Sequence, residues 1–449
     1  MPLAIDKRHA RQILHLASPA IMGLSAQVVV SLVITAMVGR LANTEVQLAA
    51  MGLGLLGTWA ITSFFSSLST GTHVLVARRH GEANDIGAGD VLNNSLAICL
   101  VCGALFGLLG YFFSFEIIDL FSREDAVTHA GAAYMRYQFL GLPFFLLIVS
   151  YRGFFFGIGH TNIFMASAII INVFNIIFSY LFIFGAFGFP RMDLAGAGIG
   201  SSISMALGWL FFLAVTFLGR YRKQYKYYSH FSLSKDVIAQ IVNISMPVSL
   251  QNILILLGFL IFVAITGIIG VVEQAASNVV INALFISLMP CFGFGIAAQT
   301  LIGQSIGRGS EDLAHAYGVE TAKMATLFTL VVGICFVAAP DAILTLLTTQ
   351  QEVIEAARPL LRVAGIAQIF YGSGIIFAHG LQAGGATVYV MMVEVVTHWI
   401  IFLPLTYLFG VTFGGGVLGA WLALPVYIVA YSASNYKKFR SSSWMNLKL

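Results

Sequence analysis

The sequence has very little charge. Only 9% of its 449 residues are Asp, Glu, Lys or Arg, whereas 59% are hydrophobic and the mean hydropathy is +0.90. Soluble domains carry roughly 25% charged residues. So few charges cannot cover a water-soluble protein, which excludes a cytosolic enzyme, a secreted domain and a disordered chain. The composition instead predicts a polytopic integral membrane protein.

Cysteine is also scarce, and the four cysteines all lie within apolar segments: Cys99, Cys102, Cys291 and Cys335. Cys99 and Cys102 are three residues apart, as are the paired cysteines of many zinc sites, but neither a second pair nor a nearby His completes such a site. We therefore interpret all four as small apolar side chains that face lipid or the protein core. We expect neither a metal site nor a cofactor.

Motifs for ATP use and for other catalysis are missing as well. The chain has no Gly-x-x-x-x-Gly-Lys-Ser/Thr loop, which excludes direct use of ATP. Its apolar segments contain no paired catalytic carboxylates, no His cluster with metal-ligand spacing and no nucleophile elbow. We do not expect an enzyme.

The sequence does contain long uncharged segments. Residues 91–115 contain no Asp, Glu, Lys, Arg or His, and of these residue types residues 46–77 contain only His73. Each such segment exceeds the roughly 20 residues that a helix needs to cross the hydrocarbon core. The segments are too long and too evenly apolar for barrel strands, and lipid offers no partner for an open backbone. We predict an all-α fold with twelve transmembrane helices near residues 13–39, 46–77, 91–118, 128–156, 162–187, 194–218, 237–269, 275–304, 319–346, 353–382, 387–410 and 415–434.

Basic residues are distributed unevenly between alternate loops. One set of loops contains most of the Lys and Arg, including Arg78, Arg79 and the loop from Arg220 to Lys235. The opposite loops contain only Arg40, Arg123, Arg191 and Arg358. Because cytoplasmic loops carry the excess of positive charge, we expect both termini in the cytoplasm. An even number of spans likewise requires both termini on the same side. We also expect the protein in the cell inner membrane.

The two halves of the chain resemble each other at a nearly constant offset of about 226 residues. Residues 71–81 align with residues 297–307, and residues 157–161 align with residues 383–387. Six spans per half let both halves enter the membrane from the same side, which makes the repeat parallel. We predict two pseudo-symmetric six-helix lobes around a central cavity, as is typical of a secondary transporter. The N-terminal lobe is residues 1–219, the cytoplasmic connector residues 220–236 and the C-terminal lobe residues 237–449.

Four short stretches identify a family. They are Ala17–Ala20 followed by Thr35–Arg40, then Leu75–Gly81, then Gly157–Thr161 with Asn172–Asn175, and finally Leu301–Gly307. In this order the chain resembles the multidrug and toxic compound extrusion (MATE) family, over about residues 12–435. The resemblance implies export of amphipathic, often cationic and aromatic compounds, driven by inward flow of protons or sodium ions.

The carboxylates that the resemblance leads us to expect are missing at four positions. Ile34 stands where many members have Asp before the Thr-Ala-x-Val-Gly run. Ser179 stands four residues after Asn175, where members with a cation site in the N-terminal lobe have Asp. The Glu of the seventh helix and the Asp of the tenth helix are also absent, at Gln251–Ile255 and Phe370–Ser373. The ion mechanism therefore cannot be inherited from the resemblance.

One carboxylate remains well inside a predicted span. Glu394 lies in the eleventh segment, and His398 lies one helical turn further along on the same face. A charged carboxylate at mid-bilayer costs roughly 3 kcal/mol, so it normally faces the protein interior. A carboxylate beside an imidazole in a low dielectric has coupled protonation, and such a pair can take up a proton on one side and release it on the other. We predict that Glu394 and His398 form the ion-coupling site. The alternative is a neutral interhelical hydrogen bond at Glu394, with His398 packed against Trp399. Pro404 gives this helix a place to bend.

Polar side chains with aromatic neighbours are the candidates for substrate binding: Asn175, Ser179, Gln251, Asn252 and Tyr371, with Gln27 and Asn282 in addition. Each could alternatively serve as an interhelical hydrogen bond. The 37 Phe residues supply ring faces for flat cations. Arg136 and Arg152 flank the apolar centre of the fourth span, and we expect both to extend to the lipid headgroups.

Taken with the resemblance, these observations predict a secondary active antiporter that exports amphipathic or cationic drugs and toxic compounds in exchange for inward protons. Sodium is the alternative ion, but its several oxygen ligands are hard to assemble from so few carboxylates. The alternative function is a lipid-linked oligosaccharide or lipid flippase of the same superfamily, for which only Arg136 and Arg152 could hold a pyrophosphate. The expected partners are small amphipathic or cationic molecules, protons or sodium ions, and the lipid bilayer. We expect a monomer and no nucleic-acid partner.

Overall fold

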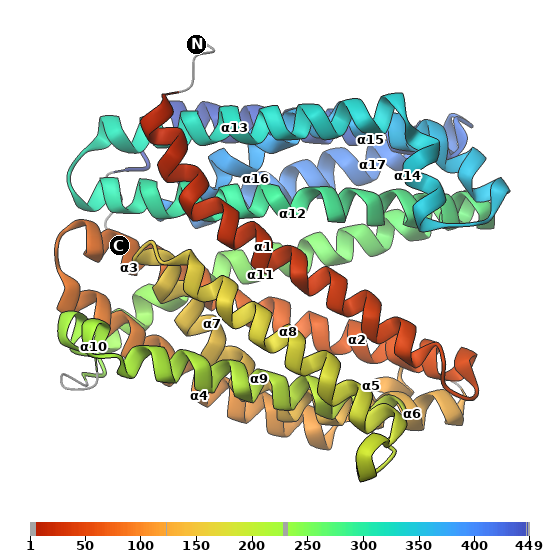
Figure 1. Ribbon diagram of the computed structural model, residues 1–449. Coiled ribbons are helices and arrows are strands. Elements are labelled where there is room, and N and C mark those ends of the chain that lie inside the picture. The colour runs from red at the N-terminus through yellow and green to blue at the C-terminus, as the bar shows by residue number, and fades with distance from the viewer. Residues whose placement is uncertain (1–5, 123, 228–231, 446, 448–449) are drawn as a thin grey trace. The chain divides into compact units, whose positions relative to one another are not determined.

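The regular structure of this protein is entirely helical in the part of the chain that the structure describes. The computed structural model describes residues 6–122, 124–227, 232–445 and 447 (Figure 1). Arg123, one of the four basic residues assigned to the outer loops, lies outside these ranges.

The first half of the chain contains six long helical segments. They are α1 (Lys7–Val38), α2 (Thr44–Ser66) with α3 (Leu68–Gly81), α4 (Asp85–Phe112), α6 (Asp125–Leu140) with α7 (Leu142–Gly157), α8 (Thr161–Phe184) and α9 (Leu194–Phe217). Three short helices join them: α5 (Ser114–Asp119), η1 (Ala186–Gly188) and α10 (Gly219–Tyr225).

The second half repeats this order. Its long segments are α11 (Lys235–Ile269), α12 (Val271–Gly307), α13 (Glu311–Ala338), α15 (Gln351–Ala383), the composite helix Thr387–Thr412 and α18 (Gly416–Arg440), with the short α14 (Pro340–Leu347) between α13 and α15. The composite helix consists of α16 (Thr387–Val395), the π-helical segment η2 (Val396–Phe402), α17 (Leu403–Tyr407) and a second π-helical segment, η3 (Leu408–Thr412).

Within the described residues, eleven helices are long and apolar enough to cross a membrane, or twelve if the bent pair α6–α7 forms one span. This confirms the predicted all-α, multi-pass membrane fold. Besides the composite helix, two predicted spans are broken or bent. The span near residues 46–77 breaks between α2 and α3 at Ser67, and the span near residues 128–156 bends by 46° between α6 and α7. Pro143, at the second position of α7, has no backbone N–H to continue the hydrogen bonding of α6.

The helices form two compact units. The N-terminal unit contains residues 22–249, and the C-terminal unit contains the described residues before 22 and after 249. The boundaries fall inside α1 and α11, two residues after Pro19 and Pro247 respectively. By contrast, the sequence repeat divides the chain at the connector. The described part of the connector packs on α4, where the Asn93 side chain donates a hydrogen bond to the Tyr227 carbonyl oxygen at 2.5 Å.

Contacts of the N-terminal parts of α1 and α11 agree with these boundaries. In the N-terminal part of α1, Tyr317 of α13 donates a hydrogen bond to the Gln12 side chain, so this part packs within the C-terminal unit. In α11, the hydroxyl of Ser249, the last residue before the boundary, donates to the Phe64 carbonyl oxygen of α2 at 2.8 Å, so the part up to Ser249 packs within the N-terminal unit.

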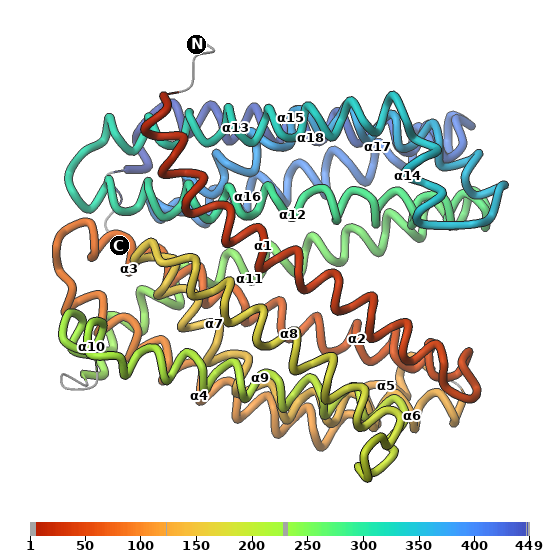
Figure 2. The backbone as a smooth tube through the Cα atoms, viewed as in Figure 1, coloured from red at the N-terminus to blue at the C-terminus, as the bar shows by residue number. Residues whose placement is uncertain are grey.

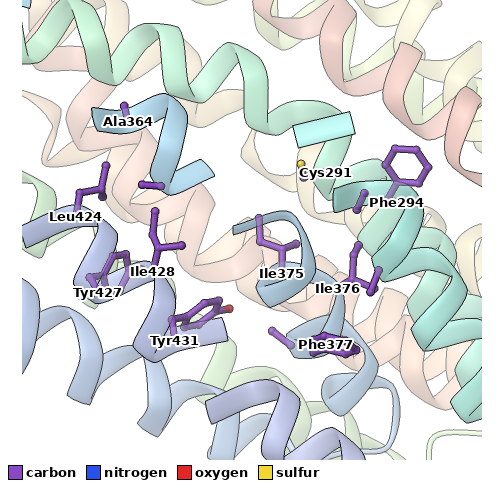
Figure 3. Packing of buried hydrophobic residues seen from close by; sticks show 14 of the residues in the cluster. Cys291, Phe294, Ala364, Ile375, Ile376, Phe377, Leu424, Tyr427, Ile428 and Tyr431 are labelled. Atoms are coloured by element: carbon purple, nitrogen blue, oxygen red, sulfur yellow. The ribbon is translucent and has the colours of Figure 1, made fainter. Parts of the chain in front are cut away.

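The C-terminal unit has its core between α12, α13, α15 and α18. These helices pack closely, and α13, α15 and α18 run alongside one another in the backbone trace (Figure 2). Cys291, Phe294, Ile376 and Leu424 are among the buried side chains that fill the space between them (Figure 3). Tyr427 and Tyr431 lie one helical turn apart on the buried side of α18 and add polar groups to this core.

Candidate functional site

Glu394 and His398 lie inside the C-terminal unit, where the composite helix changes its winding. Glu394 is in the last turn of α16, and His398 is in the π-helical segment η2. Their exposed fractions are 4% and 1%. π-helical segments are rare and occur frequently at functional sites. Pro404 follows in α17, and the helix continues through it with a second π-helical segment beyond.

The Glu394 carboxylate is held from a neighbouring helix. Tyr427 of α18 donates its hydroxyl hydrogen to Glu394 Oε1 over 2.5 Å. This distance is typical of a hydroxyl that binds a charged carboxylate. His398 Nδ1 lies 3.7 Å from the same oxygen, which is too far for a direct hydrogen bond. The strongest partner of Glu394 is therefore a tyrosine 33 residues further along the chain.

The His398 ring sits among aromatic rings. Its centroid lies 5.5, 5.2 and 5.3 Å from those of Phe259, Phe402 and Tyr427, all in edge-on geometry. A side chain at Gly258 would overlap the imidazole, so this glycine makes room for the ring. Neither ring nitrogen has a hydrogen-bond partner among the described residues. The alternative prediction is an interhelical hydrogen bond at Glu394 with His398 packed against Trp399. The hydrogen bond is present. His398, however, packs on these three rings, and the Trp399 indole donates to the Leu254 carbonyl oxygen.

Glu394 lines a small cavity of about 70 Å³ within the C-terminal unit. Most of the lining is apolar, and its side chains with polar groups are Gln368, Tyr371, Glu394, Trp421 and Tyr427. A buried water needs about 10–15 Å³ by this measure, whereas pockets for drug-sized ligands span roughly 300–1,000 Å³. The cavity can therefore accommodate a few waters or a small ion next to Glu394, but not a drug.

Tyr371 and Gln368 belong to the same polar cluster. The Tyr371 and Tyr427 rings each lie close to the Tyr431 ring, with centroids 6.1 and 6.2 Å away. Gln368 donates to Ser287 Oγ at 2.8 Å, and its side-chain oxygen has no partner among the described residues. The sequence analysis missed Tyr427 and Tyr431, although their four-residue spacing marks one polar face of an otherwise apolar helix.

The other predicted binding residues fall in different places. In the N-terminal unit, Asn175 Oδ1 accepts hydrogen bonds from Ser179 Oγ at 3.0 Å and from Ser201 Oγ at 3.2 Å. Gln251 and Asn252 lie on α11 in the C-terminal unit, and neither lines the cavity at Glu394. The structure therefore groups Asn175 with Ser179, and Tyr371 with Glu394, while the predicted binding roles remain predictions.

A second buried carboxylate escaped the sequence analysis. Glu320 is 9% exposed and forms an ion pair with Lys323 at 2.7 Å. It also accepts a hydrogen bond from the backbone N–H of Asp6 at 3.3 Å. Because α13 begins at Glu311, Glu320 is in its third turn and not at the start of a span. The carboxylate of Asp6 accepts a hydrogen bond from the backbone N–H of Arg8, and this bond holds the pKa of Asp6 below its usual value.

The two arginines of the fourth span behave differently. Arg136 is exposed and lies over the Tyr111 ring, 5.4 Å from its centroid. Arg152 is half-buried, and its guanidinium donates to Ser69 Oγ at 3.3 Å and to the Ser66 carbonyl oxygen at 3.5 Å. Polar groups of α2 and α3 thus lie within reach of Arg152, whereas its extension to the headgroups stays a prediction.

The fold and its buried site define a polytopic membrane protein that is built from two six-helix halves. A comparison with family models shows to which family the chain belongs. The MatE family model matches residues 19–181 and again residues 247–408, once in each half. The chain belongs to the MatE family.

Relatives extend this likeness over almost the full length. The probable multidrug resistance protein NorM of Thermotoga maritima is 24% identical, over 97% of this chain and 93% of the relative. The probable multidrug resistance protein NorM of Pseudomonas aeruginosa is 25% identical, over 92% of this chain and 86% of the relative.

Solved structures share the fold. A MOP superfamily transporter from Pyrococcus furiosus, described as having a binding pocket of reverse polarity, superposes with a TM-score of 0.90 at 18% identity, over 98% and 97% of the two chains. A MATE protein in complex with MaD3S superposes with a TM-score of 0.89 at 19% identity, over 97% of each chain.

Proposed function

We propose that this protein is a secondary antiporter of the inner membrane that exports amphipathic or cationic compounds in exchange for inward protons. Membership of the MatE family and relatives named as multidrug resistance proteins support export of such compounds. One observation carries the choice of ion. A single carboxylate, Glu394, is buried beside a small cavity, with a phenol hydrogen-bonded to it and an imidazole 3.7 Å away.

A proton at Glu394 would change how α16 and α18 are held together. The charged carboxylate accepts the Tyr427 hydrogen bond, and protonation removes the charge and turns the group into a donor. The strength of the contact between the two helices then depends on protonation. The π-helical segment beside Glu394 is a region where the backbone hydrogen bonds are already irregular, so the helix can adjust there.

Sodium remains the alternative ion. Sodium requires several oxygen ligands, and the side-chain oxygens around this cavity come from one carboxylate, Glu394, and from the neutral groups of Gln368 and two tyrosines. The remaining lining side chains are apolar apart from the Trp421 indole N–H. A proton needs only the carboxylate itself and a route for water.

We further propose that the two six-helix lobes, residues 1–219 and 237–449, alternate access to the substrate site with both termini in the cytoplasm. The candidate substrate contacts are Asn175, Ser179, Gln251, Asn252 and Tyr371. Asn175 and Ser179 lie one turn apart on α8, where Ser179 Oγ donates a hydrogen bond to Asn175 Oδ1. Aromatic side chains would provide the faces for flat cations.

The test is the variant Glu394→Gln in proteoliposomes. Gln keeps an acceptor for Tyr427 but cannot carry a proton, so we expect loss of dye efflux driven by a pH gradient. Glu320→Gln is the matched control, because it removes another buried carboxylate that lies away from the cavity. A sodium gradient, imposed separately, identifies the ion. Unaltered pH-driven efflux in Glu394→Gln would refute the coupling role.

A further inference from the structure

Arg152 is a cation without an anionic partner inside the N-terminal unit. It lies on α7, in a span whose neighbours contribute apolar side chains and hydroxyls. None of the six ion pairs among the described residues includes it. The carboxylates of the long helices of this unit lie near the helix starts, at Glu45, Asp85, Asp90, Asp125 and Asp236. The charge of Arg152 is therefore not neutralised by the protein around it.

Much of the hydrogen-bonding capacity of this guanidinium is unused. A guanidinium has five N–H donors. Nε donates to Ser69 Oγ at 3.3 Å, and Nη2 donates to the Ser66 carbonyl oxygen at 3.5 Å. Both distances are longer than a usual charge-assisted hydrogen bond, and both acceptors are neutral. The Nη1 group has no acceptor among the described residues.

Close packing fixes this arrangement. At Gly153, the next residue of α7, an added Cβ would lie 2.6 Å from the Ser69 carbonyl oxygen and 2.8 Å from Thr72 Cβ. The backbones of α7 and α3 therefore approach closely beside Arg152, and this holds its side chain next to the break between α2 and α3 at Ser67. A cation held in a membrane-spanning region costs free energy, and such residues usually mark a functional site.

We propose that Arg152 binds the carboxylate of an exported zwitterionic amphiphile. A planar guanidinium with free donors matches the two oxygens of a carboxylate, and one positive charge balances one negative charge. The proposal rests on the export function proposed above and adds an anion-recognising group to it. A lipid phosphodiester presents the same singly charged oxyanion, so the experiment must separate the two sources.

The probe is a pair of rhodamines that differ in one group, the free acid and its methyl ester. Binding of each is measured by fluorescence with the purified full-length protein in detergent, where no gradient and no coupling ion are needed. We expect Arg152→Gln to weaken binding of the acid by about tenfold or more. Binding of the ester should change less than twofold. Arg152→Lys keeps the charge but loses the planar geometry, so its affinity for the acid should lie between those of the wild type and Arg152→Gln.

Controls separate this role from a structural one. Arg136→Gln removes the exposed arginine of the same span and should leave both dyes unaffected. Ser69→Ala removes the Nε acceptor and offers a milder variant if Arg152→Gln folds poorly. Equal losses for acid and ester, or unchanged binding of the acid, would overturn the proposal. It would also be overturned if short-chain phosphatidylglycerol, but not the acid, bound in an Arg152-dependent way. Binding is measured without transport, so its outcome does not depend on the effect of Glu394→Gln on proton coupling. The two proposals can therefore fail separately.

Discussion

The variant Tyr427→Phe removes one hydroxyl and leaves the ring in place. That hydroxyl donates to Glu394 Oε1 at 2.5 Å, and the two residues are only 6% and 4% exposed. A hydrogen bond to a charged group contributes about 1.5–3 kcal/mol. The ring of the variant still fills the same space, so loss of the hydrogen bond is the main change, and the free energy of unfolding should fall by about 1.5–3 kcal/mol.

The assay measures the midpoint of thermal unfolding of the purified protein in detergent. Tyr431→Phe is the matched control, because its ring lies 6.2 Å from that of Tyr427 on the same helix but its hydroxyl makes no hydrogen bond to Glu394 in the described structure. We expect the control to keep the wild-type midpoint. An unchanged or raised midpoint in Tyr427→Phe would show that this hydrogen bond does not hold α18 to Glu394.

Two further predictions concern packing and the imidazole. Gly153→Ala should lower stability by about 1–3 kcal/mol, because the new Cβ would lie 2.6 Å from the Ser69 carbonyl oxygen. Gly52→Ala on α2, which would meet nothing within 4 Å, should be neutral or stabilising, and equal thermal-unfolding midpoints for the two variants would contradict the close approach of α7 and α3. His398→Phe should fold normally, since neither nitrogen has a hydrogen-bond partner among the described residues, yet it should alter the pH profile of efflux. A wild-type profile in that variant would exclude His398 from coupling.

Most of the fold could be predicted from the sequence because a membrane imposes simple rules. Uncharged segments such as residues 91–115 must be helical, and their lengths locate the spans. The breaks were harder to predict. Nothing in the apolar composition of residues 46–77 marks the interruption at Ser67, and Pro143 does not by itself specify a bend of 46°. Such irregularities depend on tertiary packing.

Only the residues of the candidate site that lie on one helix could be predicted from the sequence. Glu394 and His398 share a face because they are four residues apart, which is a local property. Tyr427 comes from a separate helix, and helical periodicity does not indicate which face of α18 meets α16. The same limit applies to Arg152, whose partners Ser66 and Ser69 lie more than 80 residues away in the sequence. Contacts between distant helices are set by packing, and a single sequence carries little information about them.

The positions of Pro19 and Pro247 have a mechanical consequence. The covalent chain crosses between the compact units only twice, after Ile21 and after Ser249, and each crossing is two residues past a proline inside a long helix. A proline removes one backbone hydrogen bond from the helix that contains it. Each crossing therefore lies beside a point where the helix lacks a backbone hydrogen bond and can bend, and the two crossings occupy equivalent places in the two repeats. Any rotation of one unit against the other must change backbone dihedrals along these two helices, because no other covalent connection joins the units.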